Sequence, residues 1–341
     1  MKIIKIGGIN WTTPGWENSA NYYVGIYILS ILNNLSNKYK YEYVEDPYKE
    51  ECDIIIYSLW GNLKNLQKCK GNPKFIYWTH EYLAGGSDKK IWDTIYNNHP
   101  PFYKGKSNKK FLTTYRNANI IFNFYKQNNY SLSFNDNDEY NLYYPFWVTV
   151  YDESIKLWER SVKNKYRNIL DKNKFCLFCS SHEIYYDSKV RINLVNELNN
   201  YKTVSCCGKA LHNTGKFYLP FDDEKSQDYC KDHKFYISFE NAKSFNDVKY
   251  ITEKLLFGWR YSCVPLYWGD NRDLKYFNKE AFVDLSNCNQ DEMIQKIIEL
   301  DNDNDKAQYI LNQYLFADKK INYKEIFDEQ LVKFVENIIG N

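Results

Sequence analysis

The sequence predicts an α/β protein with two domains, each built on an open parallel β-sheet. Strand-like apolar runs alternate with helix-length segments along most of the chain, as they do in proteins with parallel sheets. The length of 341 residues also exceeds what one ordinary hydrophobic core holds. We place the two domains at residues 1–160 and 161–320. Residues 321–341 should form a C-terminal helix that packs back on the first domain.

The first half of the chain supplies the strands of the first sheet. A helix should follow the first strand at about 20–34, with Tyr23, Ile26, Tyr27, Ser30 and Ile31 on one face. The later strands of this half contain near-continuous apolar runs, which are typical of parallel strands covered on both faces. Strands are expected at 2–8, 41–45, 53–60, 74–81 and 117–124.

The second half repeats the pattern. Ligands of such sheets bind outside the carboxyl ends of the strands, so the residues that follow each strand are the first candidates for a site. The last helix should span about 323–339. Strands are expected at 173–180, 201–207, 233–240, 262–269 and 281–285, and helices at 188–199, 250–260 and 289–300.

Composition narrows the class of protein. Hydrophobic residues make up 44% and charged residues 26%, and no run approaches the roughly 20 apolar residues of a membrane span. The N-terminal MKIIKIGGINW is interpreted as a strand rather than a signal peptide. We therefore expect a soluble, cytoplasmic protein without a membrane anchor. The net charge of +2 argues against a nucleic-acid partner.

The cysteines do not indicate a metal site. Nine are present without an export signal, so reduced thiols are expected. Cys176 and Cys179 form a CxxC pattern, but they lie in a strand-like run. Residues three apart on a strand point to opposite faces, which argues against joint zinc binding, even with Cys206 and Cys207 as partners.

Residues 234–270 carry the most informative pattern, a strand, loop, helix and second strand. Phe239, Glu240 and Asn241 should lie at the carboxyl end of the first strand. The helix should begin between 248 and 251, with Tyr250, Glu253, Lys254 and Phe257 on one face. Lys and Glu near a helix start suit a phosphate and a sugar. The same spacing also fits an amphipathic helix whose charged residues are merely solvated.

Three blocks of this segment resemble the signature of the α1,3/4-fucosyltransferases, glycosyltransferase family ten: SFEN at 238–241, YITEK at 250–254 and VPLYWG at 264–269. Weaker matches at 74–84 and 178–199 extend the resemblance to about 74–300. It implies a GT-B fold, two Rossmann-like domains with a cleft between them. It also implies inverting transfer of L-fucose from GDP-β-L-fucose to a glycan acceptor, at O3 of an N-acetylglucosamine-type sugar, to form an α-linkage.

The resemblance also implies roles for single residues. Arg191 and Lys254 would hold the GDP pyrophosphate, and Glu81 would be the general base. Asn241, Tyr250 and Glu253 would contact fucose or its linkage to the nucleotide. The loop 242–249 is longer than in bacterial members of the family, and the heptad repeats and basic tail of some of those members are absent.

Several alternatives stay open at this point. His80 could serve as the base in place of Glu81. Trp11, Trp16, Tyr82 and Trp147 could stack on an acceptor sugar or pack in the core. Gly7 and Gly8 lack the third glycine of a dinucleotide turn, so we discount an NAD site.

No metal cofactor is expected, although a divalent ion could stimulate by screening product GDP. The DxD patterns at 136–138 and 301–303 lie in Asn/Asp-rich runs that predict solvated loops. The rival functions are an inverting transferase with another sugar nucleotide and an inert nucleotide- or glycan-binding protein. The intact set of Glu81, Arg191, Glu253 and Lys254 argues against an inert protein. The sequence does not indicate the oligomeric state.

Overall fold

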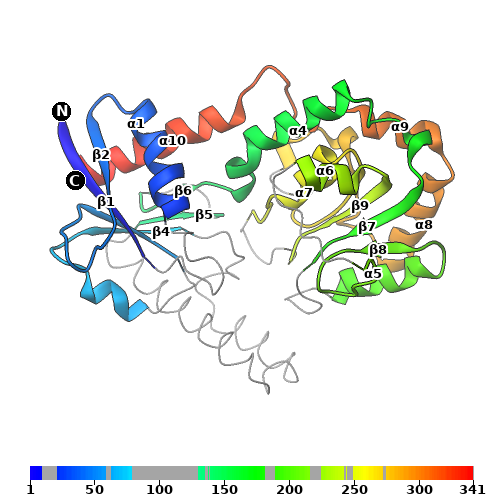
Figure 1. Ribbon diagram of the computed structural model, residues 1–341, viewed down its shortest axis with the longest axis horizontal. Coiled ribbons are helices and arrows are strands. Elements are labelled where there is room, and N and C mark those ends of the chain that lie inside the picture. Colours follow the sequence, from blue (N-terminus) through cyan, green and yellow to red (C-terminus); the bar gives the residue numbers. More distant parts are fainter. Residues whose placement is uncertain are drawn as a thin grey trace. The chain divides into compact units, whose positions relative to one another are not determined.

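The computed structural model describes residues 1–9, 21–58, 63–78, 130–134, 137, 139–180, 189–215, 224–241, 243, 249–271 and 274–340. These residues divide into two compact units, each built around a parallel sheet (Figure 1). The predicted α/β class is therefore confirmed. The first unit takes its described residues from Met1–Tyr144 and from the segment that starts at Glu325. The second takes them from Pro145–Ser244 and Lys249–Lys324. Residues 145–160 thus group with the second unit, whereas the sequence predicts the boundary at 160.

The described residues of the first unit form a six-stranded sheet with the order β2-β1-β3-β4-β5-β6. Every neighbouring pair is parallel. The predicted strands at 2–8, 41–45, 53–60 and 74–81 correspond to β1–β4, and the strand predicted at 117–124 lies outside the described residues. The strands are β1 (Lys2–Ile9), β2 (Tyr39–Val44), β3 (Ile54–Tyr57), β4 (Lys74–Trp78), β5 (Tyr130–Ser133) and β6 (Asn141–Tyr143).

Strands β5 and β6 were not predicted, because polar residues interrupt their apolar pattern. Ser131 and Ser133 donate hydrogen bonds from their hydroxyls to Oδ1 of Asn141, at 2.5 and 2.7 Å. All three residues are buried. The polar groups satisfy one another across the two strands, which makes their burial tolerable. Hydrophobic periodicity alone cannot show such a pairing.

The predicted helix at 20–34 forms, but its buried face differs from the prediction. It begins as a π-helical segment (η1, Asn21–Ile28) and continues as α1 (Leu29–Leu35). Ile26 is 64% exposed, whereas Val24 and Ile28 are buried. The prediction of the face assumed 3.6 residues a turn, and the wider π turns change which residues face the sheet.

Gly7 and Gly8 of β1 are explained by close packing. A Cβ atom on Gly8 would lie 2.8 Å from Cγ2 of Val24 in η1, and one on Gly7 would lie 2.6 Å from Cγ of Pro47. The two glycines allow the helix and the loop after β2 to approach the strand. This role accounts for the pair without a dinucleotide.

The part of the second unit that the structure describes contains a five-stranded sheet with the order β11-β10-β9-β7-β8. Its neighbouring strands are also parallel, and all five were predicted. Successive side chains of the central strand β9 enter two different clusters: Phe235 and Ile237 join one, and Tyr236 joins the other. The sheet is therefore covered on both faces. The strands are β7 (Lys174–Phe178), β8 (Val204–Cys206), β9 (His233–Phe239), β10 (Val264–Trp268) and β11 (Val283–Asp284).

The helices of the second unit are partly predicted. The helices expected at 188–199 and 289–300 form as α5 and α8, and a capping box between Asn289 and Glu292 starts α8. Three further helices were not predicted. The α-helices in the described residues of this unit are α4 (Tyr151–Lys163), α5 (Lys189–Asn199), α6 (Glu224–Cys230), α7 (Lys254–Arg260), α8 (Gln290–Asp301) and α9 (Asn304–Asn312).

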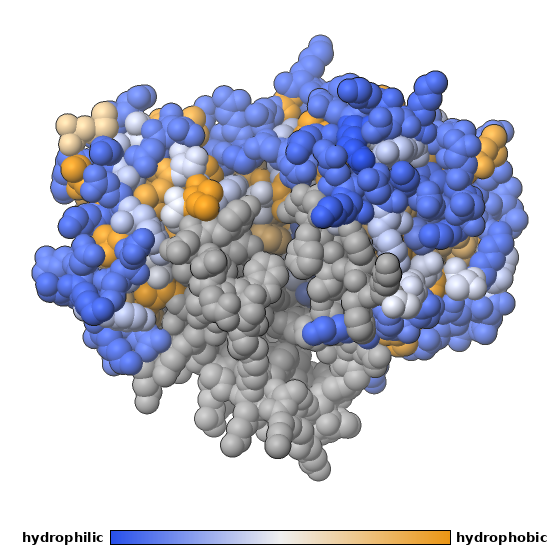
Figure 2. Space-filling model, viewed as in Figure 1, coloured by the Kyte–Doolittle hydropathy of each residue, from blue (hydrophilic) through white to orange (hydrophobic). Residues whose placement is uncertain are grey.

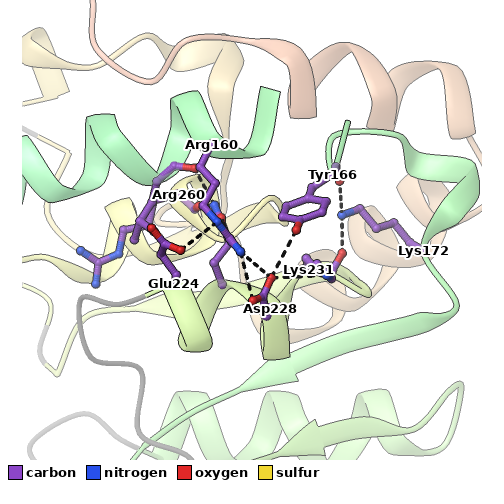
Figure 3. Close-up of polar contacts among 9 residues, drawn as sticks. Arg160, Tyr166, Lys172, Glu224, Asp228, Lys231 and Arg260 are labelled. Carbon is purple, nitrogen blue, oxygen red and sulfur yellow. Dashed lines mark hydrogen bonds and ion pairs between the residues drawn. The ribbon is translucent and has the colours of Figure 1, made fainter. Parts of the chain in front are cut away.

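A polar network joins α4 to α6. Arg160 of α4 binds both carboxylate oxygens of Asp228 at 3.0 Å, and its Nε lies 3.4 Å from the Glu224 carboxylate (Figure 3). Its Nη1 also donates to Oε1 of the buried Gln227 at 2.6 Å. The amide of Gln227 in turn donates to the carbonyls of Leu157 and Arg260. These bonds fix α4, α6 and α7 together beside the sheet.

The cysteines of the CxxC pattern face different clusters. Cys176 is fully buried with Phe235 on one side of the sheet, and Cys179 packs on the other side, where Cys207 also lies. The predicted separation of the two thiols is thus confirmed. All nine cysteines lie in the described part of the chain, and none forms a disulfide.

The C-terminal helix α10 (Tyr323–Gly340) packs on the first unit. Asp328 accepts a hydrogen bond from the Tyr144 hydroxyl at 2.7 Å. Glu336 accepts one from the Ser36 hydroxyl at 2.7 Å and pairs with Lys38 at 3.1 Å. These contacts attach the end of the chain to the strands and helices of the N-terminal half.

The described helices include none with the length and apolar character needed to cross a membrane. In the view of Figure 2 the coloured surface is mainly hydrophilic, with apolar residues scattered over it. Scattered single apolar residues are ordinary on a protein surface and indicate no particular partner.

Candidate active site

The carboxyl edge of the second sheet gathers the residues predicted to bind the donor. Strand β9 ends at Phe239, and the backbone N–H of the next residue, Glu240, donates to the carbonyl of Trp268 at the end of β10, at 2.8 Å. Glu240 is fully buried, and Asn241 follows it at the edge. The SFEN block thus carries the chain from the sheet core to the place where ligands of parallel sheets bind.

Glu240 controls the path of residues 249–253. Its Oε1 accepts a hydrogen bond from the backbone N–H of Thr252 at 2.7 Å, and its Oε2 accepts one from the Thr252 hydroxyl at 2.6 Å. The ammonium of Lys254 donates to the same hydroxyl at 3.0 Å and lies 3.6 Å from Oε2 of Glu240. One buried carboxylate therefore organises the YITEK block.

The helix in this block starts later than the sequence predicts. Helix α7 begins at Lys254, with Glu253 as its N-cap residue, so Tyr250 and Glu253 do not share a helical face with Lys254 and Phe257. The prediction of a start at 248–251 was wrong. The physical reason is that the Thr252 N–H is committed to Glu240, a residue 12 positions earlier, instead of entering a helical turn.

Burial dominates the electrostatics of Glu240. Removal from water raises the pKa of its carboxyl to about 7, and nearby Glu253 acts in the same direction. The charge of Lys254 and the two hydrogen bonds from Thr252 oppose this effect. Glu240 therefore changes charge near neutral pH, next to a lysine that was predicted to hold a pyrophosphate.

Arg191 and Asn241 meet at the same edge. Arg191 lies in the first turn of α5, is 4% exposed, and donates from Nη1 to Oδ1 of Asn241 at 3.0 Å. Lys254 also pairs with Glu253 at 3.2 Å. Asn241 directly follows Glu240, so these contacts bring four of the predicted donor residues into one continuous group. The fifth, Tyr250, is buried, with 1% of its surface exposed.

Two small residues complete the edge. A Cβ atom on Gly269 would lie 2.7 Å from Cγ of Glu240 and 2.6 Å from the Tyr267 hydroxyl, so the glycine of VPLYWG leaves room for the buried carboxylate. Ser286 accepts a hydrogen bond from the Gly269 N–H at 3.2 Å, and its carbonyl accepts one from the ammonium of Lys243. Lys243 thereby connects the residues after β9 to the residues after β11.

The remaining candidates have different outcomes. Glu81, His80, Trp11, Trp16 and Tyr82 lie outside the described residues. Trp147 is fully buried and packs on aromatic rings, among them Phe277 at 5.3 Å between ring centroids and Phe316 at 5.8 Å. Its place in the core rules out acceptor stacking in this conformation.

The second DxD pattern is not a solvated loop. Asp301 ends α8, with its side chain 5% exposed, and it pairs with Lys202 at 2.5 Å and Lys234 at 3.3 Å. Asp303 caps α9 by accepting from the Lys306 N–H at 2.9 Å. Asp136 and Asp138 fall outside the described residues. Within the described ranges, no three His, Cys, Asp or Glu side chains are grouped to hold a metal ion.

Comparison with known proteins finds a family that resembles most of the second unit. A sequence model of the C-terminal region of glycosyltransferase family 10 (fucosyltransferase) matches residues 169–330. Over these residues the chain is similar to that family. The match covers SFEN, YITEK, VPLYWG and Arg191, so the predicted resemblance is confirmed.

Curated relatives agree with the family. The chain is 25% identical over 212 residues to a putative fucosyltransferase of Acanthamoeba polyphaga mimivirus. The aligned residues make up 59% of this chain and 31% of that protein. It is 28% identical over 127 residues to an α-(1,3)-fucosyltransferase of Helicobacter pylori, 37% of this chain and 24% of that protein. The alignments thus span less than a third of either relative.

Solved structures extend the likeness to the whole chain. A crystal structure of an α1,3-fucosyltransferase with GDP matches with a TM-score of 0.68 at 17% identity, over 100% of this chain and 91% of that one. The structure of an α1,3-fucosyltransferase with GDP-fucose matches with a TM-score of 0.66, also at 17% identity, over 100% and 92%. At this identity the likeness establishes the fold, and it confirms the predicted GT-B type.

Sequence reasoning missed the part played by Glu240, Thr252 and Gly269. The only signal for Glu240 was its place inside the SFEN block, directly after an apolar strand. Its partner lies 12 residues further along, across a loop, and no local pattern indicates that contact.

Proposed function

We propose that the chain transfers L-fucose from GDP-β-L-fucose to a hydroxyl of a glycan acceptor, with inversion at the anomeric carbon. The observation that carries the proposal is the continuous group of Arg191, Asn241, Glu253 and Lys254 at the carboxyl edge of a family 10 domain. Two cations at one sheet edge suit a diphosphate, and the adjacent amide and carboxylate suit sugar hydroxyls.

In this proposal the cationic side chains bind the leaving group. Arg191 has a planar, permanently charged guanidinium, and Lys254 supplies a compact ammonium, so together they can engage both phosphates. Negative charge builds on GDP as the bond to fucose breaks, and the two cations stabilise that charge. Asn241 and Glu253 orient the fucosyl group, and Tyr250 supports it from its nearly buried position.

The chemical step is a single displacement. Glu81 takes the proton of the acceptor hydroxyl, whose oxygen forms a bond to the anomeric carbon while the bond from that carbon to GDP breaks. The attack comes from the side opposite GDP, so a β-linked donor gives an α-linked product. We propose O3 of an N-acetylglucosamine-type sugar as the acceptor position, following the family resemblance.

Titration calorimetry with several nucleotides tests the donor. We expect GDP and GDP-fucose to bind, and UDP to bind at least about tenfold more weakly, a difference of about 1.4 kcal/mol. GDP-mannose shares the diphosphate and the base, so its affinity reports how much the fucosyl group contributes. Preference for UDP over GDP would contradict the proposal and favour a transferase for another sugar nucleotide.

We also propose that no metal cofactor is required, because Arg191 and Lys254 supply positive charge where a metal would otherwise stand. Fucosyl transfer is therefore expected to persist in EDTA. A divalent ion can still stimulate by binding released GDP. Complete loss of turnover in EDTA, with recovery on addition of manganese, would contradict this expectation and direct attention to the acidic residues near 136–138.

A further inference from the structure

Within the proposed donor site, we propose that Glu240 is a positioning residue whose buried carboxylate holds Lys254 in place and takes up a proton when the sugar nucleotide binds. Glu240 itself does not touch the substrate in this proposal, unlike the residues given roles above: Arg191, Asn241, Tyr250, Glu253 and Lys254.

The geometry places Glu240 behind the site rather than in it. Its side chain is 0% exposed, whereas that of Lys254 is 21% exposed. Both carboxylate oxygens are occupied by Thr252, and Oε2 also faces the Lys254 ammonium at 3.6 Å. Among the described residues, Thr252 and Lys254 therefore connect Glu240 to a bound ligand.

Among the described residues, charged and titratable groups face Glu240 from the 249–260 segment and from β10. From the 249–260 segment, Lys254 and Glu253 face it, the first favouring its ionised form and the second opposing it. From β10, the Tyr267 ring lies beside it, and burial raises the pKa of that phenol well above its ordinary value, so it stays neutral. The carboxylates of Asp270 and Asp284 also raise the pKa of the Tyr267 phenol. Gly269 has no side chain and adds no charge. Arg191 donates its hydrogen bond to the uncharged side chain of Asn241, the residue that follows Glu240.

Binding of a diphosphate changes this balance. The phosphates place negative charge close to Lys254. The positive charge of Lys254 then interacts with the ligand as well as with Glu240, so it stabilises the ionised Glu240 carboxylate less. A nearby like charge raises the pKa of a carboxyl by about one unit or more. Because burial already holds the pKa of Glu240 at about 7, the carboxyl gains a proton on binding at neutral pH. The neutral carboxyl can still accept the Thr252 N–H bond.

Proton uptake on binding determines how the affinity for GDP-fucose changes with pH. A group that binds its proton more tightly in the complex makes affinity fall as pH rises through the two pKa values. For a rise of one unit, GDP-fucose affinity should fall roughly tenfold between about pH 6 and pH 9. Near pH 7.5 about half a proton should be taken up for each GDP-fucose bound.

Calorimetry of GDP-fucose binding, without acceptor, in two buffers of different ionisation enthalpy measures this uptake. GDP-fucose is preferred to GDP because its bridging diphosphate has no proton to exchange near pH 7. We expect uptake in the wild-type protein and none in Glu240→Gln, which mimics the neutral carboxyl. The affinity of the variant should equal that of the wild type at low pH and should not fall as pH rises.

A matched control is Glu299→Gln, an exposed carboxylate near the end of α8. The helix returns from the carboxyl edge of the sheet, and Asp301 at its end pairs with Lys234 at the start of β9, so Glu299 lies at the opposite edge. Its substitution should leave uptake and affinity unchanged.

A second variant covers the case in which Glu240→Gln does not fold. Thr252→Val keeps the β-branched shape and the backbone N–H but removes the hydroxyl that stabilises the ionised carboxylate. The pKa of Glu240 should rise, so the pH of greatest proton uptake should move upward. Binding without proton uptake in the wild-type protein, or equal uptake in Glu240→Gln, would overturn the inference. Absence of GDP-fucose binding at every pH would overturn the proposed function instead.

Discussion

The Glu81→Gln variant is expected to lose at least about 100-fold in kcat, with nearly unchanged affinity for GDP. Glutamine keeps the size and the hydrogen bonding of the side chain but cannot accept the acceptor's proton, and general-base catalysis commonly contributes this much. Glu81 comes three residues after β4 (Lys74–Trp78), an inner strand of the first sheet. The donor residues belong to the second unit, so the change should spare GDP binding.

Two further variants separate Glu81 from its rivals. His80→Ala should retain most of its turnover if Glu81 is the base. Glu253→Gln should affect donor binding more than proton transfer, because Glu253 lies beside Lys254. Near-normal kcat in Glu81→Gln, together with a large loss in His80→Ala, would move the role of the base to His80.

Arg191→Ala and Lys254→Ala are each expected to weaken GDP binding by roughly tenfold to a hundredfold. Each change removes a charge-assisted contact with a phosphate, worth about 1.5–3 kcal/mol. Calorimetry with GDP measures the effect directly. Because Arg191 is 4% exposed, its variant also needs a check of thermal unfolding.

Matched controls exist for both cations. Arg160→Ala removes an arginine that pairs with Glu224 and Asp228 on α6 (Figure 3), and Lys306→Ala removes an exposed lysine of α9. Neither should change GDP affinity. If both Arg191→Ala and Lys254→Ala fold and bind GDP as the wild type does, the phosphate assignment is wrong.

The sequence predicts the second unit better than the first, for a physical reason. Strands β7, β9 and β10 are apolar runs buried on both faces, and such runs are visible without tertiary information. Strands β5 and β6 instead bury serines and an asparagine that satisfy one another across the sheet. The π-helical start of the first helix likewise changes its buried face in a way that a 3.6-residue period does not anticipate.

The site shows the same limit. The motif blocks lead to Arg191, Asn241, Glu253 and Lys254, and the structure brings these residues to one edge. The extended path of residues 249–253 depends on a buried carboxylate 12 residues away from Thr252, so local helical spacing predicts the start of α7 too early. Glu81 is assigned through the family resemblance alone.

The most direct test of the account is transfer from GDP-fucose itself. The protein is incubated with GDP-fucose and an array of acceptor glycans, and released GDP and the linkage of any product are measured. The account predicts acceptor-dependent release of GDP and a product with an α-linked fucose. No fucosylated product with any acceptor, or transfer only from a different sugar nucleotide, would contradict it.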